Sequence, residues 1–125
     1  MKKENSTNSL NERYLLNTCD FNYVLKLIGG RWKSQIIFSI AHGNNRFSLI
    51  KQDLDNISDQ VLGRQLRNLE IEGIIEKTEI PLSIPKGIQY DFTEKADSLI
   101  PLLRELCLWG GQQKDRIKAH DHKKA

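Results

Sequence analysis

The stretch that decides the fold runs from Ile57 to Ile75 and reads ISDQVLGRQLRNLEIEGII. At 100° per residue its leucines gather on one side of a helix, and its long polar side chains gather on the other. The leucines are Leu62, Leu66 and Leu69, and the opposite face carries Gln60, Gly63, Arg64 and Arg67. Ser58 stands in the N-cap position, where a serine hydroxyl accepts a hydrogen bond from a free backbone N–H group. The stretch therefore predicts a helix over 58–70 with one face in the core and the other offered to a partner.

Two shorter helices are predicted before this stretch, and a hairpin is predicted after it. Apolar residues recur at helical spacing in 32–41 and again in 47–54, and the turn-forming residues 42–45 separate the two segments. The pattern then becomes strand-like over 74–80, and apolar and polar residues alternate over 88–92. Three helices followed by a two-stranded hairpin form a winged helix-turn-helix. The predicted fold class is therefore α+β, mainly helical, with a two-stranded wing and flanking N- and C-terminal helices.

The flanking helices are the predicted dimerisation elements. The first is indicated by Val24, Leu27 and Ile28 at spacing i, i+3, i+4. The last follows Thr93, and Pro101 should kink it or shift its start. Its apolar stripe is wider than a small core can cover, and an uncovered stripe of this size usually marks an interface. The stripe consists of Leu99, Leu102, Leu103, Leu106 and Trp109.

The charge of the chain is unevenly distributed. The formal net charge of +3 in 125 residues comes entirely from the five bases and two acids of residues 112–125, so the remainder is neutral overall. A neutral body can bind a polyanion only through a selected face. We expect a flexible arm over 1–18, the DNA-binding and dimerisation domain over 19–117, and a basic disordered tail over 118–125. Since no apolar leader or long apolar run is present, we expect a cytoplasmic protein without membrane contact.

Few residues could support catalysis or metal binding. The chain has two cysteines, Cys19 and Cys107, which are too far apart in sequence to indicate a disulfide framework or a zinc site. Such sparse cysteines are typical of a protein in a reducing compartment. The His120-x-His122 pair in the charged tail is better explained as solvated surface than as a metal site. The sequence carries no Ser-His-Asp set, phosphate loop or cleft-like pair of carboxylates. We therefore expect no enzymatic activity, no metal and no cofactor.

The polar face of the 58–70 helix matches what the major groove of double-stranded DNA accepts. Arginine can pair with guanine O6 and N7, and glutamine can pair with adenine N6 and N7. Glycine at position 63 costs roughly 1 kcal/mol of helix stability relative to alanine. Its presence is explained either by the close approach of a base edge or phosphate, or by a neutral substitution that the protein tolerates. Arg46 and Lys86 lie at loop edges and are candidates for phosphate contacts. The predicted DNA contacts are Arg46, Ser58, Gln60, Gly63, Arg64, Arg67 and Lys86.

A set of short motifs spreads over residues 19–117. They are Cys19 with Leu27-Ile28-Gly29-Gly30-Arg31-Trp32, Arg46-Phe47-x-x-Ile50, Ile57-Ser58-x-x-x-Leu62-x-x-x-Leu66-Arg67-x-Leu69-Glu70, and Pro81-x-x-x-Pro85-Lys86 with Tyr90-x-x-Thr93. In these motifs the chain resembles the HxlR family of bacterial winged-helix transcription regulators. The resemblance implies a homodimer joined by the first and last helices, including Val24 and Leu27, that binds a two-fold operator and usually represses a nearby gene. The chain departs from the family pattern at Gly63 and at Gly87, an extra residue in the hairpin loop.

Cys19 is the candidate sensor residue. It precedes the first helix, whose N-terminal dipole favours the thiolate, although the neighbouring Asp20 opposes that effect. The resemblance implies that a thiol at this position responds to oxidants or to electrophiles such as quinones, and that its modification alters dimer geometry and DNA affinity. The alternative is a small packing residue at the dimer interface.

Two other functions stay open at the level of sequence. The chain could be a ligand-responsive winged-helix regulator of the MarR or PadR type, although it lacks a long additional helical module. It could also be a winged helix that binds another protein, in which case the polar face of the 58–70 helix is ordinary solvated surface. Salt dependence separates the last alternative from DNA binding, because each phosphate contact steepens the slope of log K against log salt by about 0.9.

Overall fold

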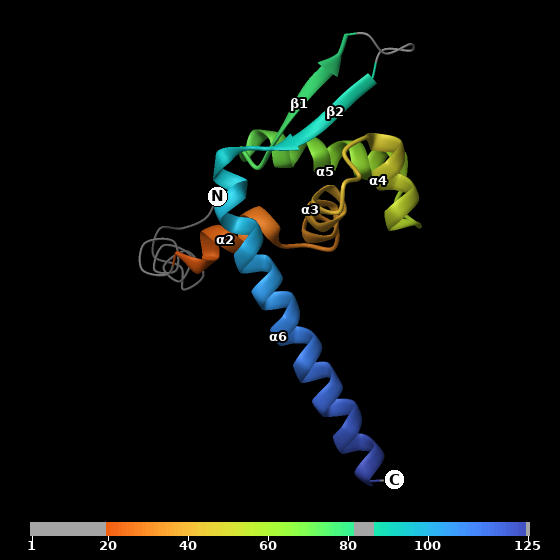
Figure 1. Ribbon diagram of the computed structural model, residues 1–125, viewed down its shortest axis with the longest axis vertical. Helices are drawn as coiled ribbons and strands as arrows, with labels where there is room; N and C mark the ends of the chain where they lie inside the picture. The colour runs from red at the N-terminus through yellow and green to blue at the C-terminus, as the bar shows by residue number, and fades with distance from the viewer. Residues whose placement is uncertain (1–19, 82–86, 125) are drawn as a thin grey trace, which may run out of the picture. The chain divides into compact units, whose positions relative to one another are not determined.

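The computed structural model describes residues 20–81 and 87–124, and side chains as far as residue 117. The chain divides into two units, the first ending at Asp91 and the second beginning at Phe92. Figure 1 shows the elements along the chain. They are α2 (Phe21–Ile28), α3 (Lys33–Ala41), α4 (Phe47–Leu54), α5 (Asp59–Ile71), β1 (Ile75–Ile80), β2 (Gly87–Phe92) and α6 (Glu94–Lys124). The predicted winged helix-turn-helix of mainly helical α+β class is confirmed.

The core of the first unit lies where α3, α4 and α5 pack together. The predicted division of α5 into two faces is confirmed, because its three leucines are buried while its arginines are exposed. Burying a leucine side chain is worth roughly 2 kcal/mol, so this face fixes the rotation of α5 about its own axis. The fully buried apolar side chains are Ile36, Ile37, Ile50, Leu62, Leu66, Leu69, Ile74 and Ile75.

The turn between α4 and α5 is short and uses an uncommon backbone conformation. Asp55 and Asn56 have positive φ angles of 46° and 54°. Aspartate and asparagine adopt positive φ more readily than most residues because their side chains bond locally. Here the backbone N–H of Asn56 donates to Oδ1 of Asp55 at 3.0 Å. The backbone N–H of Val61 then donates to the hydroxyl oxygen of Ser58 at 3.1 Å, which confirms the predicted N-cap.

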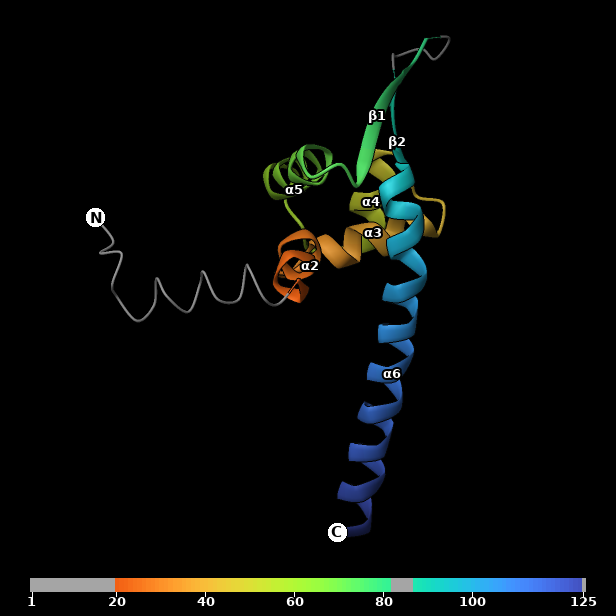
Figure 2. The same ribbon diagram turned by 90° about the vertical axis from the view of Figure 1, so that its left-hand side faces the viewer.

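The strands β1 and β2 form the predicted two-stranded wing. Figure 2 shows the hairpin extending away from the helices of the first unit. In β2 the backbone N–H of Tyr90 donates to the carbonyl of Asn45 at 2.8 Å, in the loop before α4. The wing is therefore tied to the start of α4. The predicted phosphate contact Lys86 lies in the hairpin loop, outside the described residues.

The second unit is dominated by α6. The backbone N–H of Ala96 donates to the Thr93 hydroxyl at 3.4 Å, and the helix begins at Glu94 and continues through Pro101. The proline therefore does not shift the start of the helix. The backbone is helical as far as Lys124, which corrects the disordered tail predicted for 118–125, since its lysines and alanine favour a helix that nothing interrupts. Within the described part of the chain, no helix is both long and apolar enough to cross a membrane.

Candidate nucleic-acid interface

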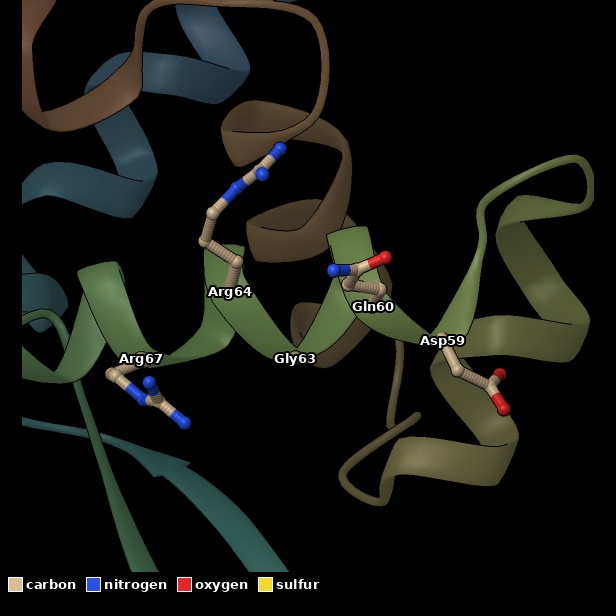
Figure 3. Close-up of a pocket in the computed structure, with 5 residues that line it drawn as sticks. All are labelled: Asp59, Gln60, Gly63, Arg64 and Arg67. Carbon is tan, nitrogen blue, oxygen red and sulfur yellow. The ribbon is translucent and has the colours of Figure 1, made fainter.

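The polar face of α5 forms a surface hollow of about 420 Å³. Its lining consists of Asp59, Gln60, Gly63, Arg64 and Arg67, all drawn in Figure 3. The side chains of Gln60, Arg64 and Arg67 are exposed, whereas the leucines on the other side of the same helix are buried. The helix is thus held by its apolar face and presents amide and guanidinium groups to solvent. Four of the predicted DNA contacts come together in this hollow.

Gly63 leaves a gap within the hollow. A Cβ atom added at this position would meet no heavy atom within 4 Å. Its φ is not positive, so the backbone conformation does not require glycine here. Figure 3 shows Arg64 and Arg67 projecting to opposite edges of the helix, with Gly63 between Arg64 and Gln60 along the helix. The gap is therefore open space within the hollow and not a packing contact with the rest of the protein.

An ion pair neutralises the acid at the N-terminal end of this face. The Nζ of Lys51, in α4, donates to Oδ1 of Asp59, in α5. Both side chains are well exposed, so the pair contributes little to folding stability. Its effect is on local charge, because an unpaired carboxylate beside Gln60 would repel phosphate. Sequence reasoning missed Lys51, since only the turn between the two helices brings it to Asp59.

Arg46 lies at the N-cap position of α4. Its backbone is extended and its exposed side chain makes no capping hydrogen bond. The first turn of α4 contains no acidic residue, so the positive end of the helix dipole is not neutralised there. The hydrogen bond from the Tyr90 backbone N–H to the Asn45 carbonyl fixes the preceding loop. Burial of the Tyr90 side chain raises its pKa, and the negative charge of Glu70 raises it further. Arg46 therefore occupies a held position where a phosphate contact is electrostatically favourable.

The predicted interface residues differ in exposure. Leu27 is buried in the first unit, so its main role is in the core of the protomer. Val24 and Leu99 are half-buried, and Leu103 is buried. The exposed members are Leu102, Leu106 and Trp109, with 62%, 50% and 63% of their surface accessible. Leu108 and Ile117 are exposed on the same helix but were not predicted. Ile117 lies at helical spacing from Leu106, which was the available signal, whereas Leu108 lies on a different face of the helix and had none. Cys19 lies outside the described residues.

Comparison with known proteins identifies the family. The sequence model of the HxlR-like helix-turn-helix family matches residues 27–118. This chain belongs to the HxlR-like helix-turn-helix family. It is accordingly a winged-helix transcriptional regulator of a DNA-binding class, and the resemblance stated from the sequence is confirmed.

Relatives of this HxlR-like regulator are known from sequence and from structure. An uncharacterised HTH-type transcriptional regulator, BH0655 of Halalkalibacterium halodurans, is 41% identical over 91 residues, which cover 72% of this chain and 80% of BH0655. The redox regulator HypR in its reduced form superposes with a TM-score of 0.72 at 27% identity, covering 79% of this chain and 97% of HypR. Diamide-treated YodB from Bacillus subtilis superposes with a TM-score of 0.64 at 30% identity, covering 75% of this chain and 92% of YodB.

Proposed function

We propose that this HxlR-like regulator is a homodimeric repressor that reads a two-fold DNA operator through α5 of each protomer. The observation that carries the proposal is the hollow on α5, where Gln60, Arg64 and Arg67 are exposed and the neighbouring Asp59 is paired with Lys51. Arginine and glutamine are the side chains that pair most specifically with guanine and adenine in the major groove. Arg46, at the N-cap of α4, supplies a phosphate contact, and Lys86 in the hairpin loop supplies another.

The homodimer is supported by the exposed apolar side chains of α6. Leu102, Leu106 and Trp109 project large apolar groups that a second copy of the same helix can cover in an isologous contact. Two protomers then present two α5 helices to half-sites about 34 Å apart. Sedimentation velocity at micromolar concentration tests this part. A dimer is expected for wild type and a monomer for Leu106→Glu, while Arg104→Glu on the same helix should remain dimeric. A monomeric wild type would contradict the proposal.

Operator recognition is tested by selection from a random DNA pool, followed by a salt titration of the selected site. The purified protein should enrich an inverted repeat whose half-site centres lie about one helical turn apart. Its affinity should fall with salt at a slope of about −0.9 for each neutralised phosphate. A flat slope and an unenriched pool would favour the alternative in which this winged helix binds protein. Repression requires only occupancy of the operator, so in vitro transcription from a promoter overlapping the selected site should decrease.

Regulation through Cys19 is the third part of the proposal. It is supported by the likeness to HypR, a redox regulator, and to YodB, which is known in a diamide-treated form. Cys19 immediately precedes Asp20 and the start of α2, where a helix dipole favours thiolate. Diamide would take two hydrogens from two thiols and join them as a disulfide, whereas a quinone would add to one thiolate. Either change at Cys19 would alter the dimer and hence DNA affinity.

A matched pair of cysteine variants tests this regulation. Diamide should reduce operator binding by wild type and by Cys107→Ser, which removes the exposed thiol of α6. Binding by Cys19→Ser should not respond to diamide. If Cys19→Ser keeps the sensitivity of wild type, Cys19 is a packing residue and the sensing role is wrong.

A further inference from the structure

The gap at Gly63 has a chemical character as well as a shape. Within α5 the backbone N–H of residue 63 is used by the i to i−4 helical ladder, so the exposed surface at this point is the Cα methylene alone. Arg64 and Arg67 line the same hollow, together with Asp59 and Gln60. At Gly63 the surface of the hollow is therefore small and apolar, while the side chains around it are polar or charged.

The DNA major groove offers one apolar group that fits the apolar surface at Gly63. Guanine, adenine and cytosine present only donors and acceptors at their major-groove edges, whereas thymine also presents its C5-methyl group. A polar base edge or a phosphate oxygen pressed against the Cα of Gly63 would lose water and gain no hydrogen bond, which is unfavourable. A methyl group loses nothing by the same contact and gains from burial.

We propose that Gly63 is a specificity-determining residue that receives the C5-methyl group of an operator thymine. The inference rests on the proposed function, since it requires α5 to lie in the major groove. The thymine lies next to a base pair read by Arg64 or Arg67, because those side chains line the same hollow as Gly63. Any β-carbon at position 63 would occupy the space of the methyl group, and for this reason the chain uses glycine despite its low helix propensity.

Removal of single methyl groups from the DNA provides the test. Each thymine of the selected operator is replaced in turn by deoxyuridine, which differs only in lacking the C5-methyl group. For wild type, one position in each half-site should lose about fourfold in affinity, the value of one buried methyl group. Replacement in both half-sites should then lose about 16-fold, the product of the two single effects.

The Gly63→Ala variant links that position to residue 63. Its Cβ enters open space, so the protein should fold and its melting temperature should not decrease. It should bind the thymine operator more weakly than wild type and should no longer distinguish thymine from deoxyuridine at the sensitive position. Gly111→Ala is the matched control, because it adds the same methyl group to a helix where an added Cβ also meets nothing within 4 Å. This control should keep the fourfold discrimination.

The possible outcomes separate this inference from the proposed function. Enrichment of an operator in which no thymine is sensitive to loss of its methyl group would overturn the role of Gly63 and leave operator binding intact. The same conclusion follows if Gly63→Ala keeps the discrimination of wild type. If the protein enriches no DNA and its binding shows no salt dependence, the proposed function fails and this inference fails with it.

Discussion

Replacing Arg64 by alanine should weaken binding to the operator far more than binding to random DNA. The side chain is exposed on α5, and it has no ion pair within the part of the chain that the structure describes. Truncation of an exposed side chain without such interactions usually changes folding stability by less than about 0.5 kcal/mol. The weaker binding measured for this variant therefore reports the interaction with DNA and not a disturbance of the fold.

The size of the effect follows from the number of arginine–guanine pairs that the substitution removes. One bidentate arginine–guanine pair discriminates by about 1–3 kcal/mol against a wrong base. A dimer on a two-fold operator carries two copies of Arg64, so the variant forgoes two such pairs, or about 2–6 kcal/mol. Since about 1.4 kcal/mol corresponds to a factor of ten, operator affinity should fall between about 30-fold and about 20,000-fold. Affinity for random DNA should fall only a few fold.

Fluorescence anisotropy with the selected operator and with a scrambled duplex, each over a range of salt, measures both quantities. Arg104→Ala, which removes an exposed arginine from α6, is the control and should change neither. Equal reductions in affinity on both duplexes, with a salt slope shallower by about 2 for the dimer, would show that Arg64 binds phosphate. That result would refute base reading by Arg64.

Three further predictions concern other features of the chain. Burial raises the pKa of Tyr90, so deprotonation favours the unfolded state and stability should fall as pH rises above 10.0. Urea titrations over a range of alkaline pH should show a smaller loss of stability in Tyr90→Phe than in wild type. Parallel curves of stability against pH for the two proteins would contradict this prediction. Ser58→Ala should lower the free energy of unfolding by about 1 kcal/mol in the same assay, because it removes the cap of α5. Ser58→Asp should keep most of the wild-type stability, because an aspartate carboxylate can accept the same hydrogen bond. Truncation before Lys118 should lower affinity for random duplexes and leave operator preference intact; a loss confined to the operator would contradict this.

Elements with strong local signals could be predicted from sequence. The helix over 58–70 is apolar every third or fourth residue and has a serine at its start, so its existence, its buried face and its cap all follow from spacing and side-chain chemistry. Its exposed face follows as well, because residues opposite a buried stripe must lie in solvent. The four residues of the hollow that were named from sequence therefore required no tertiary information.

Features that depend on two elements could not be predicted in this way. The pairing of Lys51 with Asp59 requires the positive φ angles of Asp55 and Asn56, which turn α5 back toward α4. No periodicity within one helix encodes that turn. The helical backbone over 118–124 was missed for a different reason, since polar composition indicates solvation and does not by itself exclude a helix.

The charge of the whole chain is a poor guide to how this surface meets DNA. Opposite charges further apart than a Debye length of about 8 Å barely influence each other at physiological salt, so a phosphate responds to the side chains nearest to it. On α5 those are Arg64 and Arg67, while Asp59 is already paired with Lys51. We expect the surplus of bases in 112–125 to attract any duplex without regard to its sequence. We therefore expect non-specific affinity to gain from the tail, while choice of sequence depends on α5, in a body with no net charge.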